Sequence, residues 1–274
     1  MSIVAGVDIG STTAKVVILK DGNPVASSIT YTGADCSAAA ESVLNEALQK
    51  IGADRKDLDY TVSTGYGRRA INFGDETITE ISANAKGAVF VGNEEKGGEK
   101  IRSIIDIGGQ DTKAIILDDS GRITSFAMND KCAAGTGRFL DVIARALQEP
   151  MENFVALALS SENPVTINST CTVFAESEVI SLIAKKVPKK DIIAGLHKSI
   201  ARRVTELAKT AGIKPVVFFD GGGAKNTALK QWIEKELGYE VYVPKHPQTI
   251  VALGASIFAY EKLQKKNQNN KNFK

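Results

Sequence analysis

Two eight-residue segments combine an aspartate, a glycine-containing turn and a lysine in the same order. The first is Asp8-Ile9-Gly10-Ser11-Thr12-Thr13-Ala14-Lys15, and the second is Asp106-Ile107-Gly108-Gly109-Gln110-Asp111-Thr112-Lys113. Glycine lets backbone N–H groups approach an anion closely, lysine adds positive charge, and aspartate can hold a divalent metal ion, usually through water. The two segments therefore predict a site that binds a polyphosphate together with Mg²⁺.

Each segment lies between apolar runs, at 3–7 and 16–19 for the first and at 104–105 and 114–117 for the second. Such a pattern predicts a strand, a tight turn and a second strand. A single glycine turn could do no more than join the strands of an ordinary hairpin. Two copies in identical register favour duplicated halves, each with a phosphate-binding hairpin.

Cys132 and Cys171 each follow a strand-like run and precede an apolar helical pattern. The positive end of a helix lowers the pKa of a thiol and stabilises a bound anion, and a [4Fe-4S] cluster held by four thiolates is such an anion. One chain offers two cysteines, so a twofold dimer would supply four. Because no Cys-x-x-Cys pair exists, both could instead be buried small side chains. Cys36 lies outside any sequence motif with metal-ligand spacing and is interpreted as an incidental thiol.

The composition is that of an ordinary globular chain of one or two domains. It has 274 residues, 43% hydrophobic and 24% charged, and a net charge of +2, which argues against nucleic acid as the main ligand. No long apolar span or signal peptide is apparent, so we expect no membrane association and a cytoplasmic location. His197 and His246 lie far apart without a Ser or Cys partner, which disfavours triad catalysis.

Strand and helix patterns alternate along the chain and predict an α/β fold. Further strands are expected at 25–31, 60–64, 123–128, 165–167, 216–219 and 241–243. Helices are expected at 37–51, 78–91, 138–148, from about 171, at 191–211, at 229–237 and from 248. The stretch 92–100 lacks a core-forming pattern and is the expected boundary between halves, whereas the basic residues 262–274 are expected to be disordered.

The paired hairpins resemble the two phosphate loops of the actin, sugar-kinase and Hsp70 ATPase superfamily. Three further segments narrow the resemblance: Thr64-Gly65-Tyr66-Gly67-Arg68, Asn129-Asp130-Lys131-Cys132-Ala133-Ala134-Gly135-Thr136-Gly137-Arg138-Phe139 and Ser169-Thr170-Cys171-Thr172-Val173-Phe174-Ala175-Glu176-Ser177-Glu178. They resemble the activator, component A, of 2-hydroxyacyl-CoA dehydratases, a relative of the ATPase subunits of benzoyl-CoA reductase. The resemblance covers nearly the whole chain.

The resemblance implies a duplicated actin-like, ribonuclease H-like ATPase fold with a nucleotide cleft between two lobes. The first lobe would span residues 1–98, and the second, with both cluster cysteines, residues 99–254. Residues 255–274 would form a C-terminal helix that packs back on the first lobe, followed by the disordered basic tail.

The resemblance also implies roles for individual residues. Asp8 and Asp106 would hold Mg²⁺ through water, and Gln110 or Asp111 would place the attacking water. The nucleoside would lie against Gly221, Gly222, Gly223, Asn226 and Gln248, because the triple glycine at 221–223 resembles the adenosine loop and not a P-loop. The phosphates and their surroundings would be contacted by Gly10, Ser11, Thr12, Thr13, Ala14, Lys15, Gly108, Gly109, Gln110, Gly135 and Gly137.

The function implied is that of an ATP-driven electron donor. Cys132 and Cys171 of both chains of a homodimer would share one [4Fe-4S] cluster, which ferredoxin or flavodoxin would reduce. Hydrolysis of ATP to ADP would drive the electron into a 2-hydroxyacyl-CoA dehydratase. Two alternatives stay open: a sugar or carboxylate kinase on the same fold, and a non-enzymatic ATP-gated regulator. It is also open whether Arg68 faces the nucleotide or a partner.

Overall fold

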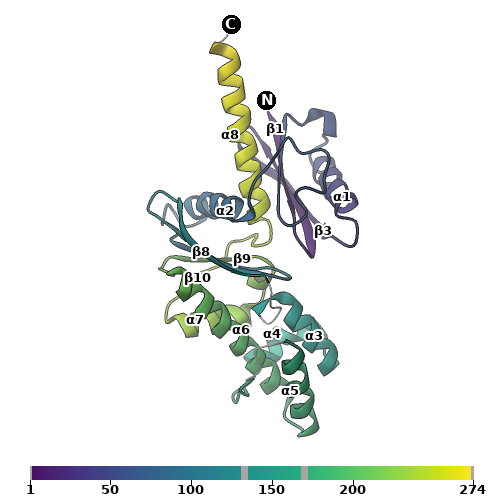
Figure 1. Ribbon diagram of the computed structural model, residues 1–274, viewed down its shortest axis with the longest axis vertical. Helices are drawn as coiled ribbons and strands as arrows, with labels where there is room; N and C mark the ends of the chain where they lie inside the picture. The colour runs from purple at the N-terminus through teal and green to yellow at the C-terminus, as the bar shows by residue number, and fades with distance from the viewer. Residues whose placement is uncertain (1, 131–134, 168–171, 273–274) are drawn as a thin grey trace. The chain divides into compact units, whose positions relative to one another are not determined.

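The computed structural model describes residues 2–130, 135–167 and 172–272. The chain forms two compact units (Figure 1), one made of Met1–Lys100 with Gln248–Lys274 and the other of Ile101–Pro247. Residues 248–254, which the sequence analysis assigned to the second lobe, thus fall within the first unit.

The first unit is built on a five-stranded sheet in the order β3-β2-β1-β4-β5. Its strands are β1 (Ile3–Ile9), β2 (Thr13–Lys20), β3 (Asn23–Tyr31), β4 (Tyr60–Thr64) and β5 (Glu76–Thr77). β2 pairs antiparallel with both β1 and β3, while β4 pairs parallel with β1 and β5 pairs parallel with β4. The hairpin and the strands expected at 25–31 and 60–64 are confirmed, and β5 is too short to leave a periodic signal.

The second unit repeats this connectivity, with the strand order β10-β9-β6-β7-β8. Its strands are β6 (Ser103–Ile107), β7 (Thr112–Leu117), β8 (Ile123–Asn129), β9 (Val217–Asp220) and β10 (Val241–Tyr242). Again a hairpin continues into an antiparallel third strand, and two parallel strands lie beyond the first. Even the ladder irregularities match, since one lies at Ile18/Leu19 and the other at Ile116/Leu117. The predicted duplicated α/β fold is confirmed.

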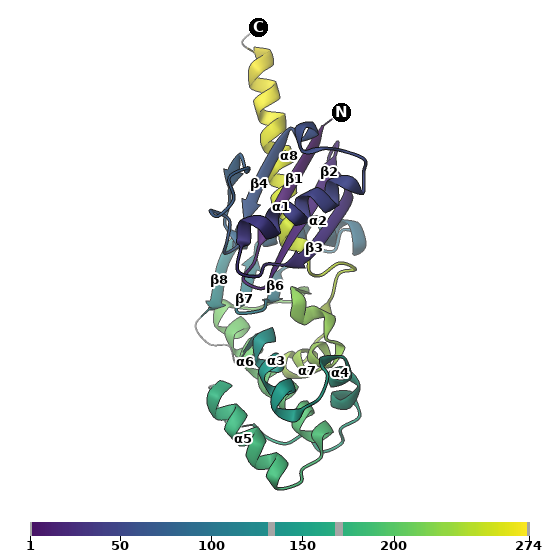
Figure 2. The ribbon, with the colours of Figure 1, turned by 90° about the vertical axis from the view of Figure 1, so that its right-hand side faces the viewer.

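Helices cover both faces of the sheet in the first unit (Figure 2). On one face lies α1 (Cys36–Gln49), whose side chains Ala40, Val43 and Leu44 join the core of β1 and β2. It begins at Asp35, whose carboxylate accepts hydrogen bonds from two of the first backbone N–H groups and so caps the helix. A short 3₁₀ turn (Arg55–Asp57) leads into β4. On the opposite face α8 (Ile250–Asn272) packs against β1 and against α2 (Glu80–Glu95).

The crossing of α8 with α2 and β1 is very close because glycines lie at the points of contact. A Cβ on Gly254 would lie 1.7 Å from the Ala83 carbonyl oxygen, and one on Gly87 would lie 2.1 Å from that of Ile250. On β1, a Cβ on Gly6 would lie 2.1 Å from the Ala252 carbonyl oxygen. Three backbones therefore touch where no side chain fits.

Substituting Gly254→Ala should destabilise the protein by about 3 kcal/mol or more, because the methyl group meets backbone atoms that cannot move aside. Chemical unfolding monitored by circular dichroism would measure the loss. The matched control is Gly238→Ala, since Gly238 has φ +81° but open space around it, and only backbone strain of about 1–2 kcal/mol is expected there. Equal losses in the two variants would contradict this packing.

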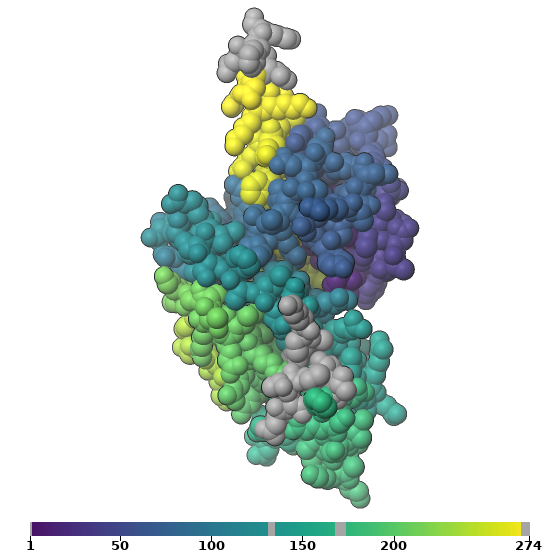
Figure 3. All heavy atoms as spheres, viewed as in Figure 1, coloured from purple at the N-terminus to yellow at the C-terminus, as the bar shows by residue number. Residues whose placement is uncertain are grey.

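The C-terminal part of α8 corrects one expectation. Residues 262–272, predicted to be disordered, continue the helix to Asn272 and extend past the sheet of their own unit (Figures 1 and 3). Lys262 donates a hydrogen bond to Glu76 at 2.8 Å, and Glu261 pairs with Lys86 at 2.7 Å. The stretch contains no proline or glycine, and Lys and Gln are good helix formers, so the helix that begins in the core propagates.

Among the described residues, four α-helices separate β8 from β9 in the second unit: α3 (Gly137–Leu147), α4 (Met151–Leu159), α5 (Thr172–Ala184) and α6 (Lys189–Ala211). α6 lies on β7 and β8 as α1 lies on β2 and β3, and α7 (Thr227–Leu237) follows β9. In the described chain, α3, α4 and α5 have no counterpart in the first unit. The duplicated scaffold therefore carries an insertion in its second half.

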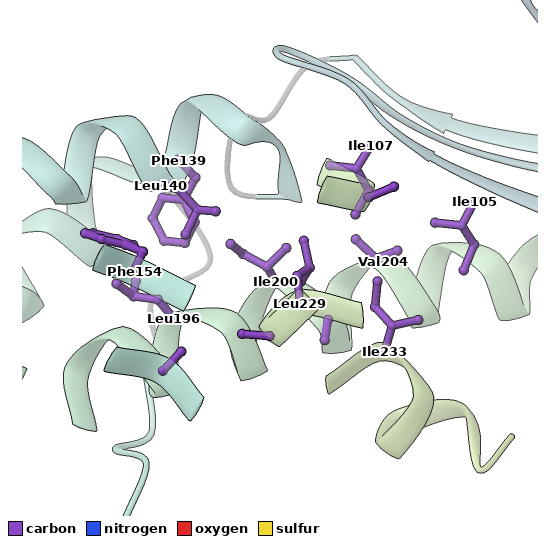
Figure 4. Packing of buried hydrophobic residues seen from close by; sticks show 14 of the residues in the cluster. Ile105, Ile107, Phe139, Leu140, Phe154, Leu196, Ile200, Val204, Leu229 and Ile233 are labelled. Carbon is purple, nitrogen blue, oxygen red and sulfur yellow. The ribbon is translucent and has the colours of Figure 1, made fainter. Parts of the chain in front are cut away.

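The core of the second unit joins this insertion to the sheet (Figure 4). Phe139 and Phe154 of the inserted helices are fully buried, and the same cluster includes Ile107 of β6 and Ile200 of α6. Helix α4 was not predicted, although the helices expected at 138–148 and 191–211 are confirmed to within two residues.

The strand expected at 165–167 is wrong. The Val165 N–H group donates a hydrogen bond to the Asp191 carbonyl oxygen at 3.1 Å, and the Val165 backbone packs on Gly195 of α6. This apolar stretch is therefore extended against a helix and not paired in a sheet.

Candidate functional site

The turn of the first hairpin holds the predicted aspartate and lysine together. Asp8 and Lys15 are opposite each other across β1 and β2, and the Lys15 ammonium lies 2.9 Å from the Asp8 Oδ2 atom. The Gly10 N–H group donates to the Thr13 carbonyl oxygen at 3.1 Å and closes the turn. The Lys15 ammonium and the backbone of the turn therefore lie close together at the end of the buried strand β1.

The second hairpin repeats this turn with one added carboxylate. Asp106 is opposite Lys113, and the Gly108 N–H group donates to the Asp111 carbonyl oxygen at 2.9 Å. The Lys113 ammonium lies 3.4 Å from Asp106 and 2.8 Å from Asp111, and only 1% of this side chain is exposed. Thr13 occupies the position of Asp111 in the first copy. Lys113 therefore pairs with two carboxylates, Asp106 and Asp111, and Lys15 pairs with Asp8.

A second turn lies against the aspartate in each unit. Gly65 after β4 and Gly221 after β9 have φ values of +87° and +79°, and a Cβ on them would lie 2.5 Å from the Asp8 Oδ1 atom and 2.3 Å from the Asp106 Oδ1 atom. The segments 64–67 and 220–223 are therefore a further pair of repeated elements. Arg68 donates from Nη1 to the Gly65 carbonyl oxygen at 2.9 Å, so its guanidinium stabilises the turn that follows β4.

The turn of the second hairpin is joined directly to α3. The Gly137 N–H group donates to the Gly108 carbonyl oxygen at 3.1 Å, and the Arg138 N–H group donates to that of Gly109 at the same distance. The Thr112 hydroxyl also donates to the Gly135 carbonyl oxygen at 2.7 Å. The first N–H groups of a helix lack partners within it, and here the turn supplies them. A displacement of this turn would therefore be transmitted to α3.

The remaining predicted residues have different environments. Thr12 and Gln110 are exposed at the tips of their turns, Ser11 and Thr13 are half-buried, and Ala14 is buried in β2. Gly222 and Gly223 lie in the short 3₁₀ helix Gly222–Lys225, which precedes α7. Gln248 is half-buried and belongs to the first unit.

Asn226, predicted to hold the nucleoside, caps α7 and contacts a buried histidine. Its side-chain oxygen accepts from the Leu229 N–H group at 2.9 Å, and its Nδ2 atom lies 2.9 Å from His197 Nε2. The other ring nitrogen, Nδ1, lies 2.7 Å from the Ile193 carbonyl oxygen. An N–H on Nδ1 and an acceptor at Nε2 satisfy both contacts, so the ring is neutral. Burial holds the pKa of His197 below its ordinary value of 6.5.

This histidine predicts a pH dependence of stability. The unfolded chain takes up a proton on His197 below about pH 6.5, while the folded protein resists it, so the contribution is complete above pH 6.5 and is lost progressively below it. Below pH 6.5, His197 changes the free energy of unfolding by at most about 1.4 kcal/mol per pH unit. Urea unfolding of wild type and His197→Gln between pH 8 and 5 would measure it. The variant should show a shallower slope below pH 6.5, and parallel curves would contradict the assignment.

The first unit offers a carboxylate oxygen suited to a hydrated cation. Asp8 is 2% exposed, and its Oδ1 atom is buried and accepts no hydrogen bond within the described chain. Mg²⁺ prefers carboxylate oxygens and retains several waters, so this oxygen fits a metal held through water. Among residues 2–130, 135–167 and 172–272, no three His, Cys, Asp or Glu side chains form a group that could bind a metal directly.

The two predicted cluster cysteines, Cys132 and Cys171, lie outside the described residues. The helix α5 begins at Thr172, the residue after Cys171, and α3 begins at Gly137 shortly after Cys132. Cys36 is half-buried at the start of α1 and packs against the core of the first unit.

A cavity of about 320 Å³ in the second unit is lined by residues 165–167 and one side of α6, including Lys198, Arg202 and Arg203. Its lining contains none of the residues predicted to bind the nucleotide. No helix in the part of the chain described by the structure is long and apolar enough to cross a membrane.

Comparison with known proteins places the duplicated scaffold in a family. The model of the BadF/BadG/BcrA/BcrD ATPase family matches residues 5–259. The chain belongs to the BadF/BadG/BcrA/BcrD ATPase family. This membership confirms the resemblance inferred from the hairpins and the cysteine segments, and it identifies the chain as a member of an ATPase family.

Three relatives are similar to this chain over nearly their whole length. The 2-hydroxyisocaproyl-CoA dehydratase activator of Clostridioides difficile is 42% identical over 97% of this chain and 98% of its own. The activator of lactoyl-CoA dehydratase of Anaerotignum propionicum is 44% identical over 95% and 98%. The (R)-2-hydroxyglutaryl-CoA dehydratase activating ATPase of Acidaminococcus fermentans is 44% identical over 95% and 98%.

Solved structures agree with the family assignment. The C. difficile activator with bound ADPNP superposes with a TM-score of 0.90 at 41% identity, covering 97% of each chain. Component A of the A. fermentans (R)-2-hydroxyglutaryl-CoA dehydratase also gives 0.90 at 41% identity, covering 96% of this chain and all of the other. A ROK family glucokinase from Streptomyces griseus matches with a TM-score of 0.56 at 14% identity, covering 95% and 100%, which shows a shared fold alone.

Proposed function

We propose that this chain is an ATP-dependent activator of a 2-hydroxyacyl-CoA dehydratase. The observation that carries the proposal is the set of three relatives, each 42–44% identical over at least 95% of this chain and each named for activating such a dehydratase. Their names differ in the acyl group, so they do not determine which 2-hydroxyacyl-CoA the partner of this chain uses.

In this proposal the two hairpin turns bind the phosphates of ATP. Asp8 and Asp106 hold Mg²⁺ through water, and Lys15 and Lys113 supply positive charge. Gln110 or Asp111 places the attacking water for hydrolysis to ADP. Gln110 is exposed at the tip of its turn, whereas Asp111 pairs with Lys113, so Gln110 is the side chain with more freedom to orient a water. The glycines 221–223 with Asn226 and Gln248 bind the nucleoside.

Cys132 and Cys171 are the proposed ligands of a [4Fe-4S] cluster, which supplies one-electron chemistry when bound. Two chains are needed for four thiolates, so we propose a homodimer. The cluster would receive its electron from ferredoxin or flavodoxin in the cytoplasm, where thiols stay reduced.

The contact between the second phosphate turn and α3 supports a way to couple the two sites. Gly108 and Gly109 accept hydrogen bonds from the first N–H groups of α3, and Cys132 precedes that helix by a few residues. Loss of the γ-phosphate would shift the turn, and α3 would shift with it. ATP can drive such a change only if it binds two conformations with different affinities.

The test is reconstitution under anaerobic conditions with a purified 2-hydroxyacyl-CoA dehydratase, a low-potential reductant and MgATP. Formation of the enoyl-CoA is expected with MgATP and not with MgADPNP, which cannot be hydrolysed. The same preparation should be offered sugars and short carboxylic acids with labelled ATP. Phosphate transfer to one of these without dehydratase activation would establish a kinase and refute the proposal.

A further inference from the structure

Two polar atoms at the carboxyl ends of β1 and β4 are buried without a hydrogen-bond partner in the described chain. They are the Oδ1 atom of Asp8 and the Oγ1 atom of Thr64. The residues are 2% and 0% exposed, respectively. Leaving a buried donor or acceptor unsatisfied costs about 1–3 kcal/mol, so two such atoms in one place indicate a missing polar group.

The two atoms belong to neighbouring positions of the sheet. Asp8 is opposite Thr64 in the parallel pairing of β1 with β4. Both residues project from the face on which Gly6 contacts α8, because side chains alternate along each strand. Asp8 Oδ1 also lies close to the backbone of Gly65, the residue after Thr64. The carboxylate oxygen and the hydroxyl are therefore at the same end of adjacent strands.

The missing group must donate a hydrogen bond to Asp8 Oδ1, and it can either donate to or accept from the Thr64 hydroxyl. An ionised carboxylate can only accept, while a threonine hydroxyl both donates and accepts. Lys15 occupies Oδ2 of Asp8, so Oδ1 is left for another donor. A water molecule satisfies both atoms at once, since its two O–H groups can donate to Asp8 Oδ1 and to Thr64 Oγ1 while its oxygen faces the metal. Water bound to a divalent cation is a strong donor because the metal polarises its O–H bonds.

We propose that Thr64 is a positioning residue for the hydrated cation, and that its hydroxyl and Asp8 Oδ1 share one water of the Mg²⁺ shell. This inference rests on the proposed function, in which Asp8 holds Mg²⁺ through water. Fixing that water from two sides orients the metal relative to the first phosphate turn. Outer-shell partners of this kind typically contribute about 10–100-fold to metal affinity.

The test compares Thr64→Val and Thr64→Ala, which lack the hydroxyl, with Thr64→Ser, which keeps it. The probe is Mn²⁺ in the presence of ADP, measured by the loss of the free-ion electron paramagnetic resonance signal. Calorimetry with ADP alone gives the metal-free affinity. The matched control is Thr205→Val, which removes a buried hydroxyl whose hydrogen bond goes to Arg202 in its own helix.

Both hydroxyl-free variants should bind Mn²⁺ about tenfold more weakly with ADP, while the serine and Thr205 variants resemble wild type. Metal-free ADP affinity should be unchanged throughout. The unfolding temperature without ligand should not fall for Thr64→Val, because a methyl group replaces an unsatisfied hydroxyl. Wild-type Mn²⁺ affinity in both hydroxyl-free variants would overturn the inference alone. Absence of Mn²⁺-dependent ADP binding in wild type would overturn the proposed nucleotide site as well.

Discussion

Replacing Cys132 or Cys171 with serine is expected to abolish the iron–sulfur cluster and ATP-dependent electron transfer. In a homodimer one substitution changes two of the four proposed ligands, because each chain contributes a copy. A serine alkoxide is a poor substitute for thiolate with iron–sulfur clusters. The visible absorption of anaerobically purified protein and its iron content should fall to background in either variant.

The matched control for these substitutions is Cys36→Ser. This third thiol is half-buried at the start of α1 and lies against the core of the first unit, in a segment without metal-ligand spacing. Its substitution should leave iron content and electron transfer close to wild type. A normal cluster in Cys132→Ser or Cys171→Ser would refute the ligand assignment, as would loss of iron in Cys36→Ser alone.

The second large effect is expected at the duplicated lysines. Lys113→Met should cost about 3–5 kcal/mol of stability, because it leaves buried Asp106 and its neighbour Asp111 without their shared cation. Lys15→Met should cost less, since the Lys15 side chain is 15% exposed and water can compensate in part for the lost charge beside Asp8.

Urea unfolding of both methionine variants would measure this difference at one pH and salt concentration. A double variant, Lys113→Met with Asp111→Asn, should recover part of the loss, because it removes one of the two uncompensated charges. Equal losses in Lys15→Met and Lys113→Met would show that Asp111 does not contribute to the requirement for Lys113.

The sequence predicts the geometry of the two hairpin turns well because their information is local. Asp8, Gly10 and Lys15 lie within one hairpin, so strand pairing brings the aspartate and the lysine opposite each other without any distant contact. The same holds for Asp106 and Lys113. The burial of Lys113 could not be read from the segment, since it depends on elements that pack around the hairpin from elsewhere in the chain.

The repeat formed by the turns at 64–67 and 220–223 is not apparent in the sequence, because an insertion changes the distance between the second turn and its hairpin. Both 64–67 and 220–223 are turns with Gly-x-Gly that follow a strand, and each lies against the aspartate of its own unit. Helices α3, α4 and α5 separate the second copy from its hairpin, so no fixed period links them. Comparing the two turns directly would have revealed the repeat, and with it Thr64.

Two local misreadings have distinct physical causes. Residues 165–167 have the β-branched composition of a strand, yet they lie against α6, where Ile167 is buried and Val165 is partly buried. The amino-acid composition of a segment indicates that the segment is buried, but it does not identify whether a sheet or a helix covers it. Residues 262–272 are polar enough to suggest disorder, but the core-packed start of α8 has already met the cost of helix nucleation, and good helix formers extend it.

We propose above that this ATPase works as a dimer whose chains share one iron–sulfur cluster. The most direct test is to determine the mass and iron content of the protein purified without oxygen, by analytical ultracentrifugation and elemental analysis of one sample. We expect a dimer with about four iron atoms and a broad visible absorption that is lost in air. A colourless monomer without iron would contradict it, even if that monomer hydrolysed ATP.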